Sequence, residues 1–115
     1  MIIKAKDMEK KQRVRLKDGY GTTDFLQIVP DEMRPKNCRL FSIMSLEKGC
    51  SVGRHAHDSE TEIYYVIEGE GIINDNGILR PFLTGDCNVC GKGDFHSVSN
   101  ENDATLKMLA VIVLD

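Results

Sequence analysis

The sequence contains no long apolar run. No stretch approaches the roughly 20 apolar residues that span a bilayer, so we expect no membrane association. The opening MIIKAKDMEKKQ has no apolar segment long enough for the central region of a secretory signal. These two absences favour a soluble protein of the cytoplasm.

An excess of positive charge is also lacking. The formal net charge is −3, which gives no general case for binding nucleic acid. The charge is uneven, because residues 1–17 carry seven Lys or Arg against two acidic residues. This basic segment could contact an acidic partner, but a solvated terminal segment is the more ordinary interpretation.

Paired cysteine motifs are scarce as well. The chain has four cysteines, Cys38, Cys50, Cys87 and Cys90. Without a secretory context they are expected to be free thiols. Cys87 and Cys90 form a C-x-x-C pair, but no second pair or extra histidine completes a zinc site. If both lie on one strand they face opposite ways, so we expect neither a redox nor a metal role for the pair.

Helical patterns are missing, and short strand patterns occupy the chain instead. Hydrophobic residues make up 41% of 115 positions, which suffices for one core and one domain over residues 1–115, with 1–23 as an N-terminal arm. The clearest strand-forming runs are 24–29, 39–46, 61–68, 78–82, 87–90 and 104–114. A brief edge strand is expected at 14–16, and Asn76-Gly77 between two apolar runs predicts a hairpin turn. Many short strands separated by turns are typical of an all-β sandwich or barrel, and a jelly roll would close its edges.

Two of the three histidines stand in the pattern His55-Ala56-His57. Residues two apart share a face only on an extended strand, so both imidazoles should converge on one point. The interval 58–61 has turn composition and precedes a strand-forming run. If this interval closes a hairpin, His57 and Glu62 become a directly opposed cross-strand pair with Cβ atoms roughly 5 Å apart. Two ligands of one metal ion can meet across that distance.

The third histidine, His96, supplies another ligand. Gly91-Lys92-Gly93 predicts a sharp turn, after which His96 can begin a strand. Histidine nitrogen and glutamate oxygen bind borderline divalent metals at roughly 2.0–2.2 Å. We therefore predict a metal site formed by His55, His57, Glu62 and His96, with Fe(II), Mn(II), Ni(II), Co(II) or Zn(II) as the ion.

Neighbours of these residues leave alternatives open. Glu62 could instead orient an imidazole from outside the coordination shell. Glu60 is a competing ligand that more naturally belongs to a solvated loop. Tyr64 lies on the same strand face as Glu62, where it either lines a pocket or belongs to the core. Four protein ligands would leave about two positions free on a six-coordinate ion.

The spacing of these residues resembles that of the cupin family. The first family motif is matched by Gly49, His55, His57, Glu62 and Gly69, and the second by Gly85, Gly93, His96 and Asn100. Gly91 departs from the second motif, since the family has proline there and glycine fixes the backbone less. Both motifs fall within residues 49–100, and the chain is similar to a small single-domain cupin of the cupin 2 conserved-barrel type.

The resemblance implies a fold and a range of functions. The fold is a double-stranded β-helix, the cupin jelly-roll barrel, with Asn100 in a structural role at a strand end. Members commonly form homodimers, often by exchanging an N-terminal strand, for which 24–29 is the candidate. Their metal sites support dioxygenases, decarboxylases and isomerases that act on small oxygen-rich molecules, and no catalytic residue stands out in this sequence. The alternative is a non-catalytic module that binds a sugar or another small molecule.

Overall fold

The chain folds into ten β-strands and three short 3-10 turns, and the computed structural model describes all of residues 1–115. The strands are β1 (Lys10–Val14), β2 (Thr22–Gln27), β3 (Cys38–Leu46), β4 (Ser51–Ala56), β5 (Glu60–Glu68), β6 (Glu70–Asp75), β7 (Ile78–Leu83), β8 (Cys87–Cys90), β9 (Phe95–Ser99) and β10 (Leu106–Leu114). The turns are η1 (Ala5–Asp7), η2 (Leu16–Asp18) and η3 (Asp31–Met33). None of these turns has the length or apolar character of a membrane span. The all-β class predicted from the sequence is confirmed.

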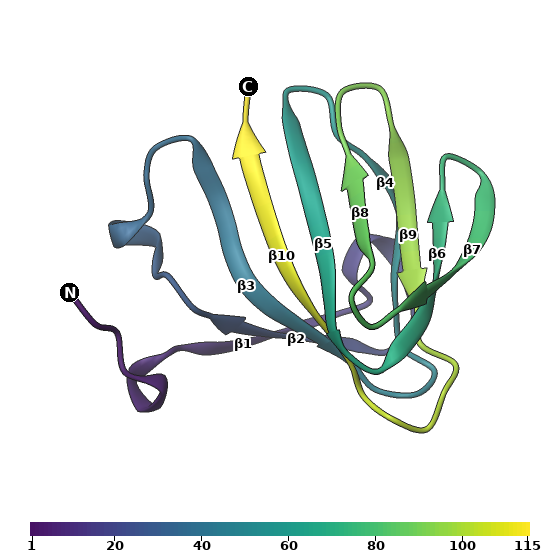
Figure 1. Cartoon of the computed structure of the whole chain (residues 1–115), viewed down its shortest axis with the longest axis horizontal. Coiled ribbons are helices and arrows are strands. Elements are labelled where there is room, and N and C mark those ends of the chain that lie inside the picture. Colours follow the sequence, from purple (N-terminus) through teal and green to yellow (C-terminus); the bar gives the residue numbers. More distant parts are fainter.

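The strands form two antiparallel sheets. One sheet has the order β1-β2-β3-β10-β5-β8 and the other the order β4-β9-β6-β7. Figure 1 shows β3, β10 and β5 side by side, with β1 and β2 crossing near their lower ends and β9, β6 and β7 forming the other side of the barrel. Residues 1–23, expected as an arm, contribute β1 to the edge of the larger sheet.

The core lies between the two sheets because side chains alternate along each strand. In β3, Ser42, Met44 and Leu46 are buried, and the residues between them face outward and are only half-buried. Val52 and Val98 belong to the same hydrophobic cluster from the smaller sheet. The inward-facing positions of both sheets therefore determine which polar groups reach the interior.

The tight turn between β6 and β7 follows the sequence prediction. Asn76 and Gly77 occupy it with φ values of 52° and 95°. Both values lie in the left-handed region that an Asn-Gly hairpin turn requires. The predicted edge strand at 14–16 is displaced, because β1 ends at Val14 and the chain then enters η2.

The predicted hairpin between the strand of His55 and the strand of Glu62 is wrong. β4 pairs with β9, whereas β5 pairs with β10 on one side and β8 on the other. Both edges of β5 are therefore occupied, and the short connection 57–59 carries the chain from one sheet to the other. Turn composition and a five-residue spacing fit such a crossing as well as they fit a hairpin.

Asn100 ends β9 in the structural role expected of it. It is fully buried, and its Nδ2 donates to the carbonyl oxygens of Leu46 at 2.8 Å and Ala104 at 2.9 Å. Its Oδ1 accepts from the backbone N–H of Asn102 at 2.9 Å. The side chain thus satisfies backbone groups where three segments meet.

Candidate metal centre

Four side chains from the two sheets meet inside the barrel. His55 lies on β4, His96 on β9 and Glu62 on β5, and His57 directly follows β4. Their ligand atoms all lie within 4.8 Å of one another. Glu62 Oε1 lies 3.1 Å from His55 Nε2, 3.1 Å from His57 Nε2 and 2.9 Å from His96 Nε2. The structure brings together the four residues that the sequence singles out.

Strand register explains how this cluster forms. His55 and His96 are direct cross-strand partners of β4 and β9, and their Nε2 atoms are 3.0 Å apart. Glu62 approaches from the opposite sheet, where it stands between Ile112 of β10 and Cys90 of β8. The cluster therefore bridges the two sheets, and its geometry depends on how they pack.

Each imidazole is held through its Nδ1 atom by an oxygen acceptor. The pairs are His55 with the Gly53 carbonyl oxygen at 2.8 Å, His57 with Glu60 Oε2 at 2.7 Å, and His96 with Asn88 Oδ1 at 2.7 Å. Because each partner accepts, each Nδ1 carries the proton, and in a neutral imidazole Nε2 then presents a lone pair. Three such lone pairs and a carboxylate oxygen face one another, which is the arrangement that a cation stabilises.

The short separations in the cluster fit neighbouring ligands of a metal ion. Ligand atoms at right angles around an ion about 2.1 Å away stand about 3.0 Å apart, whereas tetrahedral ligands stand about 3.4 Å apart. The contacts of Glu62 Oε1 with the nitrogens of His57 and His96, at 3.1 Å and 2.9 Å, match the right-angled case. That case belongs to six-coordinate ions, which would keep about two positions for another ligand.

Burial and hydrogen bonding set the protonation of the cluster. Burial acts to raise the pKa of the Glu62 carboxyl, but contacts with the three imidazoles hold it far below its ordinary value of 4.5. Contact with Glu62 raises the pKa of His57 above 6.5, with help from Glu60. Burial lowers the pKa of His96. Without metal, the cluster therefore favours a proton on His57, and a divalent cation would replace that proton.

Glu60 belongs to this site and not to a solvated loop, so that expectation is corrected. β5 begins at Glu60, which turns the side chain to the same face as Glu62. Arg39 donates to the two Glu60 oxygens at 3.0 Å and 2.8 Å. This contact lowers the pKa of Glu60 below 4.5. Glu60 therefore orients His57 from outside the ligand set, which is the alternative role that the sequence predicts for Glu62.

Tyr64 fulfils both of its predicted roles. It is 1% exposed, and its ring stacks on His96 with centroids 4.8 Å apart and an interplanar angle of 5°. It also lines the cavity beside the cluster. Burial, with a contribution from Glu62, raises the pKa of the hydroxyl well above 10.0, so it stays protonated.

Cys87 and Cys90 face opposite sides of β8, as predicted. Cys87 is exposed and Cys90 is buried as the cross-strand partner of Glu62. Burial raises the pKa of the Cys90 thiol to about 11. A thiol with that pKa holds its proton at neutral pH and is a poor nucleophile.

Gly91 departs from the cupin motif and is stabilised differently. Its N–H donates to Asp94 Oδ2 at 3.1 Å, and the Asp94 N–H donates back to the Gly91 carbonyl oxygen at 3.0 Å. Proline at this position would remove the first of these bonds. The two hydrogen bonds between Gly91 and Asp94 thus hold the loop before His96 in place without the rigid ring of a proline.

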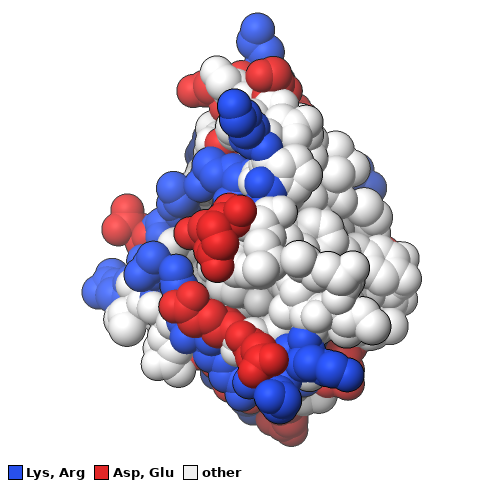
Figure 2. Space-filling model, turned by 90° about the vertical axis from the view of Figure 1, so that its left-hand side faces the viewer, with Lys and Arg blue, Asp and Glu red and all other residues white.

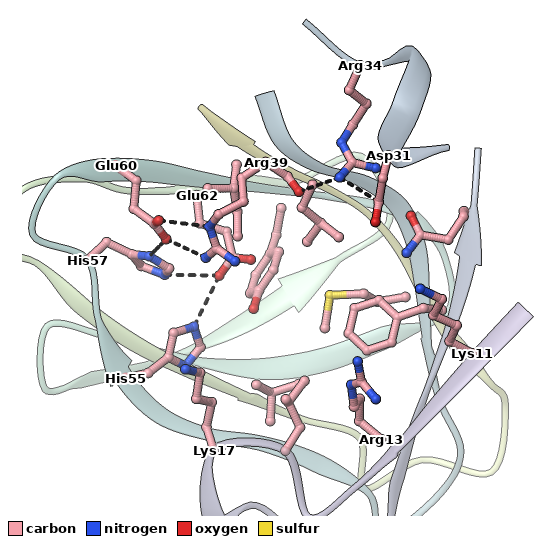
Figure 3. Close-up of a pocket in the computed structure, with 18 of the residues that line it drawn as sticks. Lys11, Arg13, Lys17, Asp31, Arg34, Arg39, His55, His57, Glu60 and Glu62 are labelled. Carbon is pink, nitrogen blue, oxygen red and sulfur yellow. Dashed lines mark hydrogen bonds and ion pairs between the residues drawn. The ribbon is translucent and has the colours of Figure 1, made fainter. Parts of the chain in front are cut away.

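A cavity of about 420 Å³ opens beside the cluster. Its cationic lining residues are Lys11, Arg13, Lys17, Arg34 and Arg39, and its acidic ones are Asp31, Glu60 and Glu62. Figure 3 shows His55, His57, Glu60 and Arg39 on one side of this cavity, with Lys11 and Arg13 opposite them. The basic N-terminal segment is therefore not simply solvated, because three of its cations line the cavity.

Sequence reasoning missed Asn88, Arg39 and these N-terminal cations. Asn88 is a buried polar residue in an otherwise apolar strand, and Arg39 is the second residue of β3, from which its side chain reaches Glu60. The polar position within the strand at 87–90 was an available signal. For the N-terminal cations the sequence offers a weaker signal, which is the excess of basic residues before position 18.

The fold and site together define a class: a double-stranded β-helix whose interior carries a three-His, one-Glu group capable of binding metal. Residues 42–112 match the family model described as Cupin domain. The chain therefore belongs to the cupin family, and the expected barrel is confirmed.

One relative matches nearly the whole chain, and one solved structure matches all of it. The chain is 34% identical over 114 residues to a Thermotoga maritima protein called oxalate-binding protein, covering 99% of this chain and 94% of that one. It superposes on the crystal structure of a predicted oxalate decarboxylase from Thermotoga maritima with a TM-score of 0.93, 34% identity and 100% coverage of both chains. A sugar phosphate isomerase of the cupin superfamily from Silicibacter pomeroyi, 22% identical over 100% of this chain and 76% of that one with a TM-score of 0.81, shares the fold alone.

Proposed function

We propose that the chain binds one divalent transition metal through His55, His57, Glu62 and His96, and through it a small chelating anion such as oxalate. The observation that carries the proposal is the Nδ1 contact of every imidazole, which leaves each Nε2 for the ion. An ion with about two open positions accepts two neighbouring oxygens of one ligand.

The charge of the cavity supports an anionic ligand. Five cationic side chains line it against three acidic ones, of which Glu62 would be bound to the metal. A bound divalent ion would add further positive charge. Oxalate offers two oxygens at chelating distance and two negative charges, and a relative of 34% identity carries the name oxalate-binding protein.

Each residue has a separate part in this function. The metal, when bound, would polarise the ligand oxygens as a Lewis acid. Glu60 and Asn88 fix the orientation of His57 and His96 from behind. Arg39 holds Glu60 by two hydrogen bonds, and Tyr64 covers one face of His96.

Decarboxylation is the second candidate, because the Glu60 carboxylate lines the cavity beside the cluster. Splitting oxalate into carbon dioxide and formate requires one proton to be delivered to carbon. Glu60 is held ionised by Arg39, and Tyr64 has a pKa well above 10.0. Neither group is suited to release a proton at neutral pH, so binding is the better-supported function.

Metal analysis and calorimetry test the proposal. Protein stripped with a chelator and reloaded should take up one ion per chain, and only the loaded form should bind oxalate. His55→Ala should lose both, whereas the neighbouring and exposed Arg54→Ala should keep both. The proposal fails if the unaltered chain binds no metal, or if His55→Ala binds as well as Arg54→Ala. Release of formate from oxalate would instead support the decarboxylase.

Dimer formation through the outer face of the larger sheet is also proposed. Outward positions there carry apolar side chains, namely Phe41, Ile43, Ile63, Tyr65, Val89, Leu109 and Val111. Figure 2 shows a broad area free of charged side chains beside a band crowded with them. An apolar face of this kind favours a second copy of the chain. The exchange of strand 24–29 and the cytoplasmic location stay predictions, and β2 pairs with β3 of its own chain here.

A further inference from the structure

Three cations that line the cavity beside the His–Glu cluster have no acidic partner. Lys11, Arg13 and Lys17 line the cavity, and no carboxylate lies within ion-pair distance of them. The other two lining cations are paired, Arg34 with Asp31 at 2.7 Å and Arg39 with Glu60 at 2.8 Å. A concave surface with unpaired charges of one sign attracts a ligand of the opposite sign.

Strand register turns two of these cations inward. Lys11 is the cross-strand partner of Phe25, and Arg13 that of Thr23. Phe25 lines the cavity and Thr23 is buried, so β1 presents Lys11 and Arg13 on the face that looks into the barrel. Figure 3 shows both side chains extending from β1 into the cavity, opposite the His–Glu group.

The third cation is tied to the strand that carries His55. Lys17 lies in η2 with a left-handed φ of 54°. Its carbonyl oxygen would be 1.9 Å from a Cβ added at Gly53, so these two backbones are in close contact. Gly53 in turn accepts the hydrogen bond of His55 Nδ1 at 2.8 Å. A left-handed lysine is strained, and the tight packing against Gly53 holds it in place.

The cavity has room for a ligand larger than oxalate. Oxalate has six non-hydrogen atoms, and even at about 30 Å³ each, the share of a water molecule, they occupy about 180 Å³. The cavity measures about 420 Å³. More than half of it, including the part lined by β1, would stay empty of ligand.

We propose that the preferred ligand is a longer bifunctional anion, and this inference rests on the proposed metal-dependent function. One end is a 2-oxo or 2-hydroxy carboxylate whose two oxygens chelate the metal. The other end is a second anionic group, carboxylate or phosphate, that Lys11, Arg13 and Lys17 bind.

Pairs of probes that differ only in the distal anion test this inference. On metal-loaded protein, 2-oxoglutarate is compared with 2-oxovalerate for a distal carboxylate, and 3-phosphoglycerate with glycerate for a phosphate. At least one distal anion should lower Kd tenfold or more, and the pair that shows this identifies the group. In Lys11→Gln/Arg13→Gln this ratio should fall below threefold, and Lys17→Gln should reduce it in part. Lys10→Gln, on the outer face of the same strand, should leave it unchanged.

The possible outcomes distinguish a failure of this inference from a failure of the proposed metal-dependent function. If oxalate binds but neither distal anion improves affinity, the inference is overturned and the proposed function stands. A gain that persists in Lys11→Gln/Arg13→Gln also overturns it. If no probe binds, oxalate included, both fail together. The ratio of the paired Kd values is the readout, because a general loss of affinity in a variant cancels from it.

Discussion

Replacing Glu60 with glutamine tests whether the residue that orients His57 contributes to metal affinity. Glu60 accepts from His57 Nδ1 at 2.7 Å and from Arg39 at 3.0 Å and 2.8 Å. Glutamine keeps the shape but turns one acceptor into an amide donor. That donor faces Arg39 alone in one orientation, and both Arg39 and His57 in the other. In either orientation His57 loses a charged partner, so its ring is less well oriented and its Nε2 is a weaker base.

The expected loss is in metal affinity. Changing the outer partner of a metal-bound histidine commonly costs 10–100-fold, which is about 1.4–2.8 kcal/mol. The carboxylate here is ionised and its bond to His57 is short, so we expect the upper half of that range. Competition between the protein and a chromophoric chelator of known affinity measures the Kd directly.

The matched control is Glu68→Gln, the same change at the exposed end of β5. The Glu68 carboxylate forms an ion pair with the exposed Lys107 at 3.8 Å, and Glu68 is far along the strand from the cluster. Its metal Kd should equal that of the unaltered chain. Equal affinities for Glu60→Gln and Glu68→Gln would refute the role assigned to Glu60, provided that both variants retain the far-ultraviolet spectrum of the fold.

Three more outcomes follow from the structure. Thermal stabilisation by metal should shrink as the pH is lowered from 8 to 5.5, because only neutral imidazoles bind the ion. His57, with its pKa above 6.5, is the first of the histidines to take up a proton as the pH falls. A stabilisation independent of pH would argue against imidazole ligation. Gly53→Ala should lower the free energy of unfolding, measured with denaturant, by about 1–3 kcal/mol and weaken metal binding, since its Cβ would lie 1.9 Å from the Lys17 carbonyl oxygen. Gly91→Ala should lower the free energy of unfolding much less. Iodoacetamide should label Cys90 only on unfolding, as peptide mass analysis would show, because Cys90 is buried with a pKa of about 11.

Local patterns in the sequence predicted most of the fold and the site. The period-two spacing of His55 and His57 and the Asn76-Gly77 turn each depend on a few neighbouring residues, and the structure confirms both the strand and the turn. Tyr64 faces inward with Glu62 because residues two apart on a strand share a face. The cupin motifs then supplied the long-range arrangement that local patterns do not contain.

Partner choice between strands could not be predicted from the same patterns. The spacing of His57 and Glu62 predicts a hairpin, yet β4, which precedes His57, and β5, which carries Glu62, belong to different sheets. A short polar connection reverses the chain equally well within a sheet or between sheets, because its composition specifies only a turn. Glu60 was misplaced for the same reason, since a residue assigned to a loop has no defined face.

The placement of the cluster explains why both sheets are needed for function. His55 and His96 come from one sheet and Glu62 from the other, so the site exists only when the barrel closes. An ion bound by all of them would link the two sheets and stabilise the closed barrel through mass action, by about 2.7 kcal/mol at a free metal concentration 100 times Kd. The cations of β1 are placed differently, because they lie on an edge strand and would meet the ligand from outside the cluster. Metal binding and ligand selection are therefore carried by separate parts of the fold, and a substitution in β1 can change the second without removing the first.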